Sequence, residues 1–429
     1  MSPTQAESSS VLPAPRPLRI LIGTLYYPPH VRGGYELATA LAVEQLRARG
    51  HRVEVVCGKA DGFEDDRIHP VLEPRLQEER GLFDASFEAS NLERWRLHVN
   101  RPANGRATRA VLRETDAQVY LAFNQGLVSI APLLAARRLG LPTLIYACDL
   151  WPTNHWLREW RARGGKRVRR RLLEQLWKRK LGPAGVGPVI ATSEYLADEL
   201  AVGGVPRGTI DVAHLSCPPD AFALGQGVEP NPRGASERLR VLCASMWWEG
   251  KGVHVALDAV ERALKAGVDL ELELAGSGSG EYAKGLRERA QGGILKGRVT
   301  LSEGLDRSEL LERFLGAHAV VVPSQWGEPF ALVPLEAAAT GCAVVATRDG
   351  GNPEFVHEGQ TGRLVDRGDG EDLARVLGEL FAQEDQRLRL ASAAKARVGE
   401  LHSPGSFVDR IESKLLALTG ESSTKSISR

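Results

Sequence analysis

Two glutamates that lie eight positions apart, Glu328 and Glu336, carry the clearest chemical signal in this sequence of 429 residues. They flank the start of a predicted helix from about Phe330 to Gly341, which follows an apolar strand at Val320–Val322 and a loop. The first amides of a helix are unpaired and lie at the positive end of its dipole, so they form an anion site, usually for phosphate. Glu336, nearly two turns into the helix, reaches back toward this site, and Glu328 stands on its other side. The order of carboxylate, anion site and carboxylate matches the sugar hydroxyls, diphosphate and ribose hydroxyls of a nucleotide sugar.

Spacing alone leaves a second interpretation open, because two glutamates eight positions apart are common by chance and often form a solvated surface pair. The flanking strand, the glycine-containing loop and the alanine-rich helix favour the functional interpretation, since an anion site needs that architecture. The segment 321–341, VVPSQWGEPFALVPLEAAATG, also resembles the E-x7-E signature of family 4 glycosyltransferases, which are retaining enzymes of the GT-B fold. The similarity continues through residues 342–365, CAVVATRDGGNPEFVHEGQTGRLV, which look like that family's strand, Gly-Gly-x-Pro-Glu turn and glycine-rich hairpin.

The resemblance implies a role for each residue around the predicted helix start. The amides of Ala331 and Leu332, beside Phe330, would hold the donor diphosphate. Glu336 would hold the ribose hydroxyls, and Glu328 would grip the hydroxyls of the transferred sugar. A bound donor would therefore lie along the whole segment.

A lysine in the stretch 244–253, ASMWWEGKGV, is the next candidate. Lys251 opens a predicted helix, where it would add positive charge to a second anion-binding helix start. A lysine before a helix is usually just solvated, but by resemblance Lys251 matches the family lysine that contacts the donor diphosphate. The family usually carries an arginine five residues earlier, where this chain has Met246. One expected cation is therefore missing, and Arg348 is a candidate to replace it.

A pair of glycines, Gly33 and Gly34, lies in the stretch 26–36, YYPPHVRGGYE, between the first predicted strand and a helix. Glycine lets a backbone approach a ligand closely, although a lone pair of glycines also fits a plain tight turn. The pair resembles the family's N-terminal Gly-Gly loop, which closes over the donor phosphate and the acceptor. We therefore place Gly33 and Gly34 in the donor site.

The stretch 144–156, LIYACDLWPTNHW, ends another strand of the first half at the same predicted cleft. In the family this strand commonly ends in His-Asp near the reacting sugar, whereas this chain has Cys148 and Asp149. Asp149 is therefore a candidate to position sugar or acceptor hydroxyls, and we count it with Glu328 and Lys251 as catalytic. Cys148 is interpreted as a small buried residue rather than a nucleophile, and the nearby histidine at position 155 could supply an imidazole.

Two further stretches border the predicted donor site. By resemblance, the loop after the strand Val299–Ser302 offers backbone contacts from Gly304 and Leu305 to the nucleobase. The run AGSGSG at 275–280 looks like a dinucleotide fingerprint only superficially, and in the family it is a loop beside the donor. Nothing in either stretch selects uracil, guanine or adenine.

Residues 158–180, REWRARGGKRVRRRLLEQLWKRK, form a strongly basic stretch with an apolar helical face. Such a helix could lie on an anionic membrane or meet an acidic acceptor, so peripheral membrane contact is one interpretation. A helix packed on its own domain with a solvated charged face is the other. The net charge of +1 gives no argument for nucleic acid as a partner.

Composition sets the class of protein. Hydrophobic residues make up 43% and charged residues 25%, as in soluble globular proteins. Five cysteines are scattered singly, which argues against a zinc site or a disulfide framework and favours the reducing cytoplasm. We expect neither a signal peptide nor a run of about twenty apolar residues that could span a bilayer. The expected location is the cytoplasm, with the inner face of the membrane as an alternative.

Short apolar runs alternate with helical patterns almost throughout, which predicts parallel sheets built from βαβ units. In the first half, strands are expected at Leu18–Leu25, His51–Cys57, Gln118–Phe123, Thr143–Ala147, Val189–Thr192 and Ile210–Ala213. Helices are expected between them at Tyr35–Arg49, Leu127–Leu139 and Ser193–Leu200. In the second half, the expected strands are Leu239–Ser245, Leu270–Ala275, Val299–Ser302 and Ala319–Val322, with helices at Val253–Ala266 and Ser308–Leu315.

This pattern predicts an α/β protein of the GT-B type, with two Rossmann-like doubly wound domains facing a cleft and ligand at the carboxyl ends of the strands. The predicted divisions are a disordered extension at 1–17, an acceptor domain at 18–216, a linker at 217–238, a nucleotide-sugar domain at 239–403, a helix crossing back to the first domain at 404–418 and a disordered tail at 419–429. The stretch 58–115 has no readable motif, yet it is expected to shape acceptor choice.

Taken together, these features predict a retaining hexosyltransferase. It would move a sugar from a nucleoside-diphosphate sugar to a hydroxyl of a glycan, a lipid or a small-molecule natural product. Neither a metal nor another cofactor is expected, because the family neutralises the diphosphate with helix starts and cationic side chains. Two alternatives remain, a catalytically weak relative that serves as a ligand-binding or scaffold protein, and a GT-B sugar phosphorylase or epimerase. Met246 and Cys148 favour the first alternative.

Overall fold

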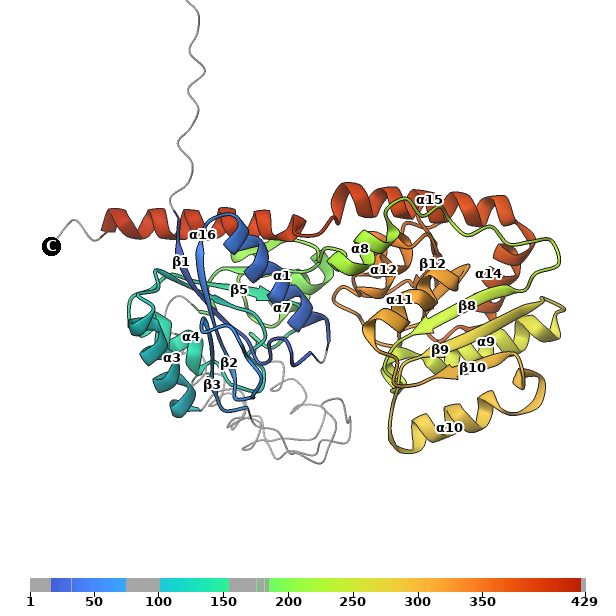
Figure 1. The fold of residues 1–429 in the computed structure, drawn as a ribbon, viewed down its shortest axis with the longest axis horizontal. Coiled ribbons are helices and arrows are strands. Elements are labelled where there is room, and N and C mark those ends of the chain that lie inside the picture. The colour runs from blue at the N-terminus through green and yellow to red at the C-terminus, as the bar shows by residue number, and fades with distance from the viewer. Residues whose placement is uncertain are drawn as a thin grey trace, which may run out of the picture.

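The computed structural model describes residues 17–31, 33–74, 101–153, 175, 181 and 185–425, with side chains described up to residue 420. It contains two parallel β-sheets, one in each half of the chain (Figure 1). The first sheet has the strand order β3-β2-β1-β4-β5-β6-β7, and the second has the order β10-β9-β8-β11-β12-β13. The predicted fold class, two Rossmann-like doubly wound domains, is confirmed.

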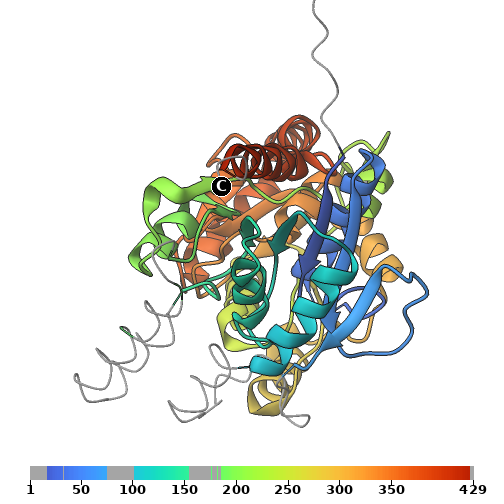
Figure 2. The same cartoon turned by 90° about the vertical axis from the view of Figure 1, so that its left-hand side faces the viewer.

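The central strands of the first sheet are buried on both faces, as parallel strands flanked by helices must be. The strands are β1 (Arg19–Gly23), β2 (Arg52–Gly58), β3 (Ile68–Leu72), β4 (Val119–Ala122), β5 (Thr143–Ala147), β6 (Val189–Ala191) and β7 (Ile210–Val212). One face is covered by α3 (Pro102–Glu114), α4 (Ala131–Arg138) and α7 (Glu194–Val202). The other face is covered by α1 (Gly34–Ala48) and α16 (Ser406–Lys425) (Figure 2).

The second sheet repeats this layered arrangement. Its strands are β8 (Leu239–Ala244), β9 (Leu270–Ala275), β10 (Val299–Ser302), β11 (Ala319–Val322), β12 (Ala343–Thr347) and β13 (Arg363–Val365). One face packs against α9 (Val253–Lys265), α10 (Gly280–Ala290) and α14 (Gly370–Ala382). The other face packs against α11 (Arg307–Gly316), α12 (Val333–Ala339) and α15 (Glu384–Leu401).

Two segments connect the domains. The first passes through α8 (Pro219–Gly225), so the predicted linker at 217–238 contains a helix that its proline and glycine content had concealed. The second leads from α15 into α16, which runs along the first domain (Figure 1). There Arg49, at the end of α1, pairs with Glu412 and Asp409 of α16, both at 2.5 Å. This helix continues to Lys425, beyond its predicted end at residue 418.

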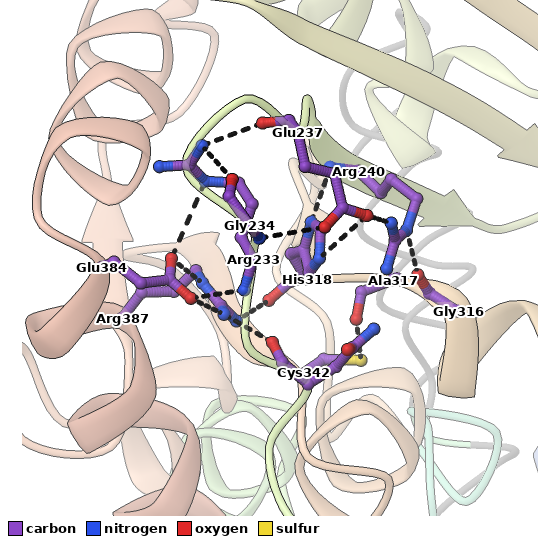
Figure 3. A network of polar contacts seen from close by, with 11 residues as sticks. Arg233, Gly234, Glu237, Arg240, Gly316, Ala317, His318, Cys342, Glu384 and Arg387 are labelled. Carbon is purple, nitrogen blue, oxygen red and sulfur yellow. Dashed lines mark hydrogen bonds and ion pairs between the residues drawn. The ribbon is translucent and has the colours of Figure 1, made fainter.

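Beyond α8, the chain is fastened to the second domain by a buried arginine (Figure 3). Arg387 of α15 is fully buried and donates hydrogen bonds to the carbonyl oxygens of His318 at 3.0 Å and Asn231 at 2.6 Å. Glu384, one turn earlier, pairs with Arg387 and accepts a hydrogen bond from the amide of Arg233 at 2.8 Å. A buried charge is tolerated only when it is paired and hydrogen-bonded, and Arg387 meets both conditions. The linker therefore follows a fixed path into the second domain.

Most predicted elements end within two residues of their observed bounds, and the strands at 143–147, 270–275, 299–302 and 319–322 match them. The helix predicted at 127–139 begins only at Ala131, because Ser129 has a φ of 67°, outside the helical region. The stretch 58–115, in which the sequence showed no motif, contains β3 and α3. Residues 1–16 and nearly all of the basic stretch 158–180 lie outside the described residues, so the disordered extension and the membrane-binding helix stay predictions.

Candidate active site

Glu328 lies in the loop after β11, and its carboxylate is bound to a lysine from a neighbouring loop. Its Oε1 atom accepts hydrogen bonds from Lys251 Nζ at 2.7 Å and from Ser324 Oγ at 2.6 Å. Lys251 ends a short 3-10 helix, η2 (Glu249–Lys251), that follows β8. Because β8 and β11 are adjacent parallel strands, their carboxyl ends bring the two loops together. Glu328 is only 5% exposed, so Lys251 neutralises a buried charge.

Glycines allow these loops to pack closely. Gly252 has a φ of 66°, and a Cβ atom there would lie 1.8 Å from the carbonyl oxygen of Pro323. Gly350 has a φ of 63°, and a Cβ atom there would lie 2.4 Å from the carbonyl oxygen of Glu328. The amide of Gly351 donates a hydrogen bond to that same oxygen at 2.7 Å. The Gly-Gly turn after β12 therefore fixes the backbone of Glu328.

Glu336 is paired with an arginine that the sequence analysis missed. It is 4% exposed, and its Oε1 atom lies 2.5 Å from Nη1 of Arg307, which opens α11. Arg307 also pairs with Asp220 of α8, whose carboxylate oxygens lie 2.8 and 2.9 Å from the guanidinium. Burial raises the pKa of Glu336, although Arg307 opposes that shift. Burial alone would lower the pKa of Arg307, but Asp220 and Glu336 hold it above its ordinary value.

The helix that carries Glu336 is shorter than predicted. α12 begins three residues after the expected start at Phe330. Phe330 is kept out of the helix because its ring stacks on His214, with centroids 5.0 Å apart and an interplanar angle of 9°. The amides of Ala331 and Leu332 therefore belong to the loop before the helix. Glu336 lies in the first turn rather than nearly two turns in, which brings it closer to that loop.

The start of α12 keeps the character that an anion site needs. Within the described part of the chain, no side chain caps it. The first hydrogen bonds of the turn are donated by the amides of Leu335 and Glu336 to the carbonyl oxygen of Leu332, at 2.9 and 3.0 Å. Pro334 lies in this first turn, as predicted. Amides that precede Leu335 have no carbonyl one turn earlier in the helix and suit an external acceptor.

The glycine pair of the first domain lies opposite this loop. A Cβ atom on Gly34 would lie 2.9 Å from Cδ1 of Leu332, so the two domains meet here. The amide of Gly33 donates a hydrogen bond to Oε2 of Glu36 at 2.8 Å, which fixes the start of α1. The structure thus brings Gly33 and Gly34 of the first domain to the segment that carries both glutamates.

Asp149 follows β5, and its Oδ1 atom accepts a hydrogen bond from the amide of Trp151 at 2.7 Å. The hydroxyl of Tyr35, the neighbour of Gly34, accepts a hydrogen bond from the amide of Cys148 at 2.6 Å. Burial raises the pKa of Tyr35 well above its ordinary value, and the charge of Asp149 raises it further, so Asp149 lies close to the glycine loop. Burial likewise raises the pKa of the Cys148 thiol, which keeps the sulfur protonated and weakly nucleophilic. The histidine at position 155 lies outside the described residues.

The loop expected to border the nucleobase leads directly to Arg307. Gly304 has a φ of 71°, and Leu305 is partly buried against the core beside α11 and α12. The AGSGSG run has a packing role, since a Cβ atom on Gly278 would lie 2.4 Å from the carbonyl oxygen of Trp247. The only signal for Arg307 in the sequence was its position two residues after Leu305.

Arg348 contacts the hairpin around β13. Its guanidinium donates a hydrogen bond to the carbonyl oxygen of Leu364 at 3.1 Å. The same group lies 3.8 Å from the carboxylate of Glu358 and 3.7 Å from that of Asp366, in the hairpin around β13. Met246 is 38% exposed and contributes no charge. These contacts hold the Arg348 guanidinium at the hairpin, and its suggested role as the replacement cation stays a prediction.

No cluster of three or more His, Cys, Asp or Glu side chains among the described residues is arranged to hold a metal ion. No helix among the same residues is long and apolar enough to cross a bilayer.

Two family models match the chain and together include every site residue that the sequence predicted. The model described as glycosyl transferases group 1 matches residues 234–397, and the model described as glycosyl transferase 4-like domain matches residues 33–215. The chain belongs to the family 4-type glycosyltransferases. The family resemblance inferred from the segment 321–341 is thereby confirmed.

Curated relatives match different lengths of this chain. A D-inositol 3-phosphate glycosyltransferase of Corynebacterium urealyticum is 38% identical over 149 residues, which are 34% of this chain and 35% of that protein. A glycogen synthase of Mycobacterium tuberculosis is 28% identical over 397 residues, which are 89% of this chain and 90% of that protein. The chain spans 35% and 46% of the length of the first two curated relatives that it matches.

Solved structures of glycosyltransferases share the fold of this chain. A glycosyltransferase of Rickettsia africae has a TM-score of 0.68 and 15% identity, and the match covers 93% of this chain and 98% of that one. Anabaena HepE in complex with UDP-glucose has a TM-score of 0.66 and 18% identity, and the match covers 93% of this chain and 99% of that one. At such identities the likeness shows the fold alone, which is the GT-B arrangement of this glycosyltransferase family.

Proposed function

We propose that this chain is a retaining glycosyltransferase that moves a sugar from a nucleoside-diphosphate sugar to an acceptor hydroxyl. The observation that carries the proposal is the arrangement of the two buried glutamates. Glu328 pairs with Lys251 and Glu336 pairs with Arg307, on either side of the uncapped loop 329–332. Two carboxylates flank a segment suited to an anion, and the glycine loop of the first domain faces that segment.

The proposed roles follow from these contacts. Hydroxyls of the donor sugar would replace Lys251 as the hydrogen-bond donors to Glu328, which frees Lys251 for the diphosphate. Ribose hydroxyls would donate to Glu336, whose orientation Arg307 fixes. Amides of Ala331 and Leu332 would bind the phosphate oxygens. No metal ion is required in this scheme, because the amides and Lys251 supply the positive potential.

In the proposed reaction, the acceptor oxygen forms a bond to the anomeric carbon and gives its proton to the departing diphosphate oxygen, while the bond from that carbon to the diphosphate breaks. The electron pair leaves with the diphosphate, where Lys251 and the loop amides stabilise the added charge. Asp149, at the carboxyl edge of the first sheet, would position acceptor or sugar hydroxyls from the opposite side. Retention of the anomeric configuration is proposed on the family resemblance.

A second candidate function is ligand binding without turnover. Met246 favours it, because this exposed residue brings no charge to a position where the family usually has an arginine. A binding protein of this kind would retain nucleotide affinity and release no product. A sugar phosphorylase, the other alternative, would depend on inorganic phosphate instead of a nucleotide.

The proposed function is tested in two steps. Thermal melts with UDP, GDP, ADP and their sugars should show stabilisation by one nucleotide series, since a ligand at 100 times its Kd adds about 2.7 kcal/mol. UDP-glucose is the first probe, because the structure of HepE was solved with it. The sugar that binds is then incubated with candidate acceptors, and the anomeric configuration of the product is determined by NMR. Stabilisation without any sugar release would support the binding protein, and an inverted product would refute retention.

A further inference from the structure

We infer that Glu354 is a positioning residue, which holds the first domain against the donor loop, residues 323–332 between β11 and α12, in the arrangement that sugar transfer needs. This inference rests on the proposed function. Glu354 belongs to α13 (Asn352–Phe355) in the second domain, within the Gly-Gly-x-Pro-Glu turn. Its two carboxylate oxygens accept hydrogen bonds from the amides of Glu194 and Tyr195, each at 2.9 Å. These amides open α7 in the first domain, so one side chain bonds both domains.

Glu354 completes the cap of α7. Within the first domain, Ser193 Oγ accepts a hydrogen bond from the amide of Leu196 at 3.0 Å, and the two amides before it turn to Glu354. A carboxylate at a helix start is stabilised by the unpaired amides and by the dipole. Burial alone would raise the pKa of Glu354, but the hydrogen bonds from His214 and the two amides bring it below its ordinary value. Glu354 is therefore ionised at neutral pH.

The same carboxylate reaches the segment where the chain first leaves the first domain. Oε2 of Glu354 lies 2.9 Å from Nε2 of His214, which follows β7. The ring of His214 stacks on Phe330 of the donor loop and, with centroids 5.7 Å apart, on His402. His402 precedes α16, and its carbonyl oxygen accepts a hydrogen bond from the amide of Cys217 at 2.8 Å. Glu354 thus contacts His214, whose ring packs on the second connecting segment at His402.

The other end of this turn holds Glu328. Gly350 and Gly351 pack on the backbone of Glu328, where the amide of Gly351 donates to the Glu328 carbonyl oxygen. Tyr195 also touches the donor loop, because a Cβ atom on Gly327 would lie 2.0 Å from its hydroxyl oxygen. A short series of contacts therefore links the start of α7, through Glu354 and the Gly-Gly turn, to the backbone of Glu328, whose carboxylate would grip the sugar.

These contacts predict how the loss of the Glu354 carboxylate would affect nucleotide affinity and transfer. Donor contacts from Lys251, Arg307 and Glu336 lie within the second domain, so nucleotide affinity should remain. The acceptor side of the cleft belongs to the first domain. Without the Glu354 contacts, that domain would be held less firmly relative to Glu328. A displacement of about 1 Å between reacting groups can cost on the order of a hundredfold in rate. Water would also reach the donor more easily.

The test is Glu354→Gln, whose single amide oxygen cannot accept from both backbone amides in the same way. Asp369→Asn is the matched control, because Asp369 also accepts hydrogen bonds from two helix-start amides, those of Glu371 and Asp372, within one domain. We expect Glu354→Gln to lower kcat for transfer about tenfold to a hundredfold. UDP affinity should stay within about twofold of wild type, and the ratio of donor hydrolysis to transfer should rise. Asp369→Asn should change none of these quantities.

A second measurement does not depend on turnover. Amide hydrogen exchange should accelerate in the peptides 194–200 and 321–332 of Glu354→Gln and not in those of Asp369→Asn. If Glu354→Gln does not fold, His214→Phe keeps the ring stack and removes one hydrogen bond to the carboxylate, and it should show the same pattern more weakly. Unchanged exchange and unchanged kcat in Glu354→Gln would overturn the inference, and so would a loss of UDP affinity as large as the loss of kcat. If wild type transfers no sugar, the proposed function fails, and unaltered exchange would independently refute the bridging role of Glu354.

Discussion

Replacing Glu336 with glutamine is the sharpest test of the donor site. If Glu336 accepts a hydrogen bond from a ribose hydroxyl, its charge makes that bond worth about 1.5–3 kcal/mol. Losing it would raise the Kd of the cognate nucleotide roughly 10- to 150-fold. The fold should tolerate the change, because Arg307 keeps its two contacts with Asp220 at 2.8 and 2.9 Å and a buried charge is removed.

The assay is isothermal titration calorimetry with UDP, GDP and ADP on folded wild type and variant. Asp220→Asn is the control, because it weakens the same arginine from the other side and leaves the carboxylate of Glu336 intact. We expect a large loss of affinity in Glu336→Gln and a small one in Asp220→Asn. Wild-type affinity in Glu336→Gln would refute the ribose role, and equal losses in both variants would assign the effect to Arg307.

The pH dependence gives a second readout for Glu336. Burial raises the pKa of this carboxyl above 4.5, so the folded protein retains its proton at a higher pH than the unfolded chain does. The contribution of this carboxyl to stability is therefore fully present below its pKa in the unfolded chain. It is lost as the pH rises through its pKa in the folded protein. Nucleotide binding needs the ionised form and should weaken as the pH falls toward that raised pKa. This dependence should vanish in Glu336→Gln.

Three further predictions concern other parts of the molecule. Gly34→Val would place side-chain atoms against Leu332, because a Cβ atom at position 34 would lie 2.9 Å from Cδ1 of Leu332. In a transfer assay kcat should fall about tenfold, while the melting temperature stays unchanged. Burial lowers the pKa of His318 from 6.5 to about 4. Neutral His318 therefore contributes roughly 3 kcal/mol to the free energy of unfolding. This contribution is present above the pKa of the unfolded chain and is lost as the pH falls toward the pKa of the folded protein. Melts between neutral pH and pH 4 should show this loss, and His318→Asn should reduce it. Arg387→Leu removes the fully buried charge beside Glu384 and should lower the free energy of unfolding by about 3–5 kcal/mol in denaturant titrations.

The sequence predicted the sheets well because strands buried on both faces are continuous apolar runs with turn residues at their ends. β11, with the sequence AVVV, is such a run, and its bounds were predicted as observed. The stretch 58–115 was unreadable because β3 lies at the sheet edge and is only half-buried, which leaves little apolar pattern. Local pattern therefore sufficed where burial was complete on both faces.

The details of the site depended on contacts between residues far apart in the sequence. The start of α12 was misplaced because Phe330, a good candidate for the first helical turn, stacks instead on His214, 116 positions earlier. Arg307 and Asp220 were missed because each looks like an ordinary charged residue at a helix start. Their significance comes from the contacts of Arg307 with Asp220 of α8 and with the buried Glu336 of α12, and no local pattern reveals these contacts.

The charges around the donor loop explain how the site could work with one cation fewer than its family usually has. Without donor, Lys251 is committed to Glu328 and Arg307 to Glu336, so each buried carboxylate is neutralised. Donor hydroxyls can satisfy Glu328, which releases Lys251, whereas Arg307 stays fixed by Asp220. Met246 adds no charge, so the proposed exchange of partners, from Glu328 to the diphosphate, depends on Lys251. Replacing Lys251 with methionine should therefore lower kcat far more than it lowers nucleotide affinity, and equal losses in the two quantities would contradict the exchange of partners.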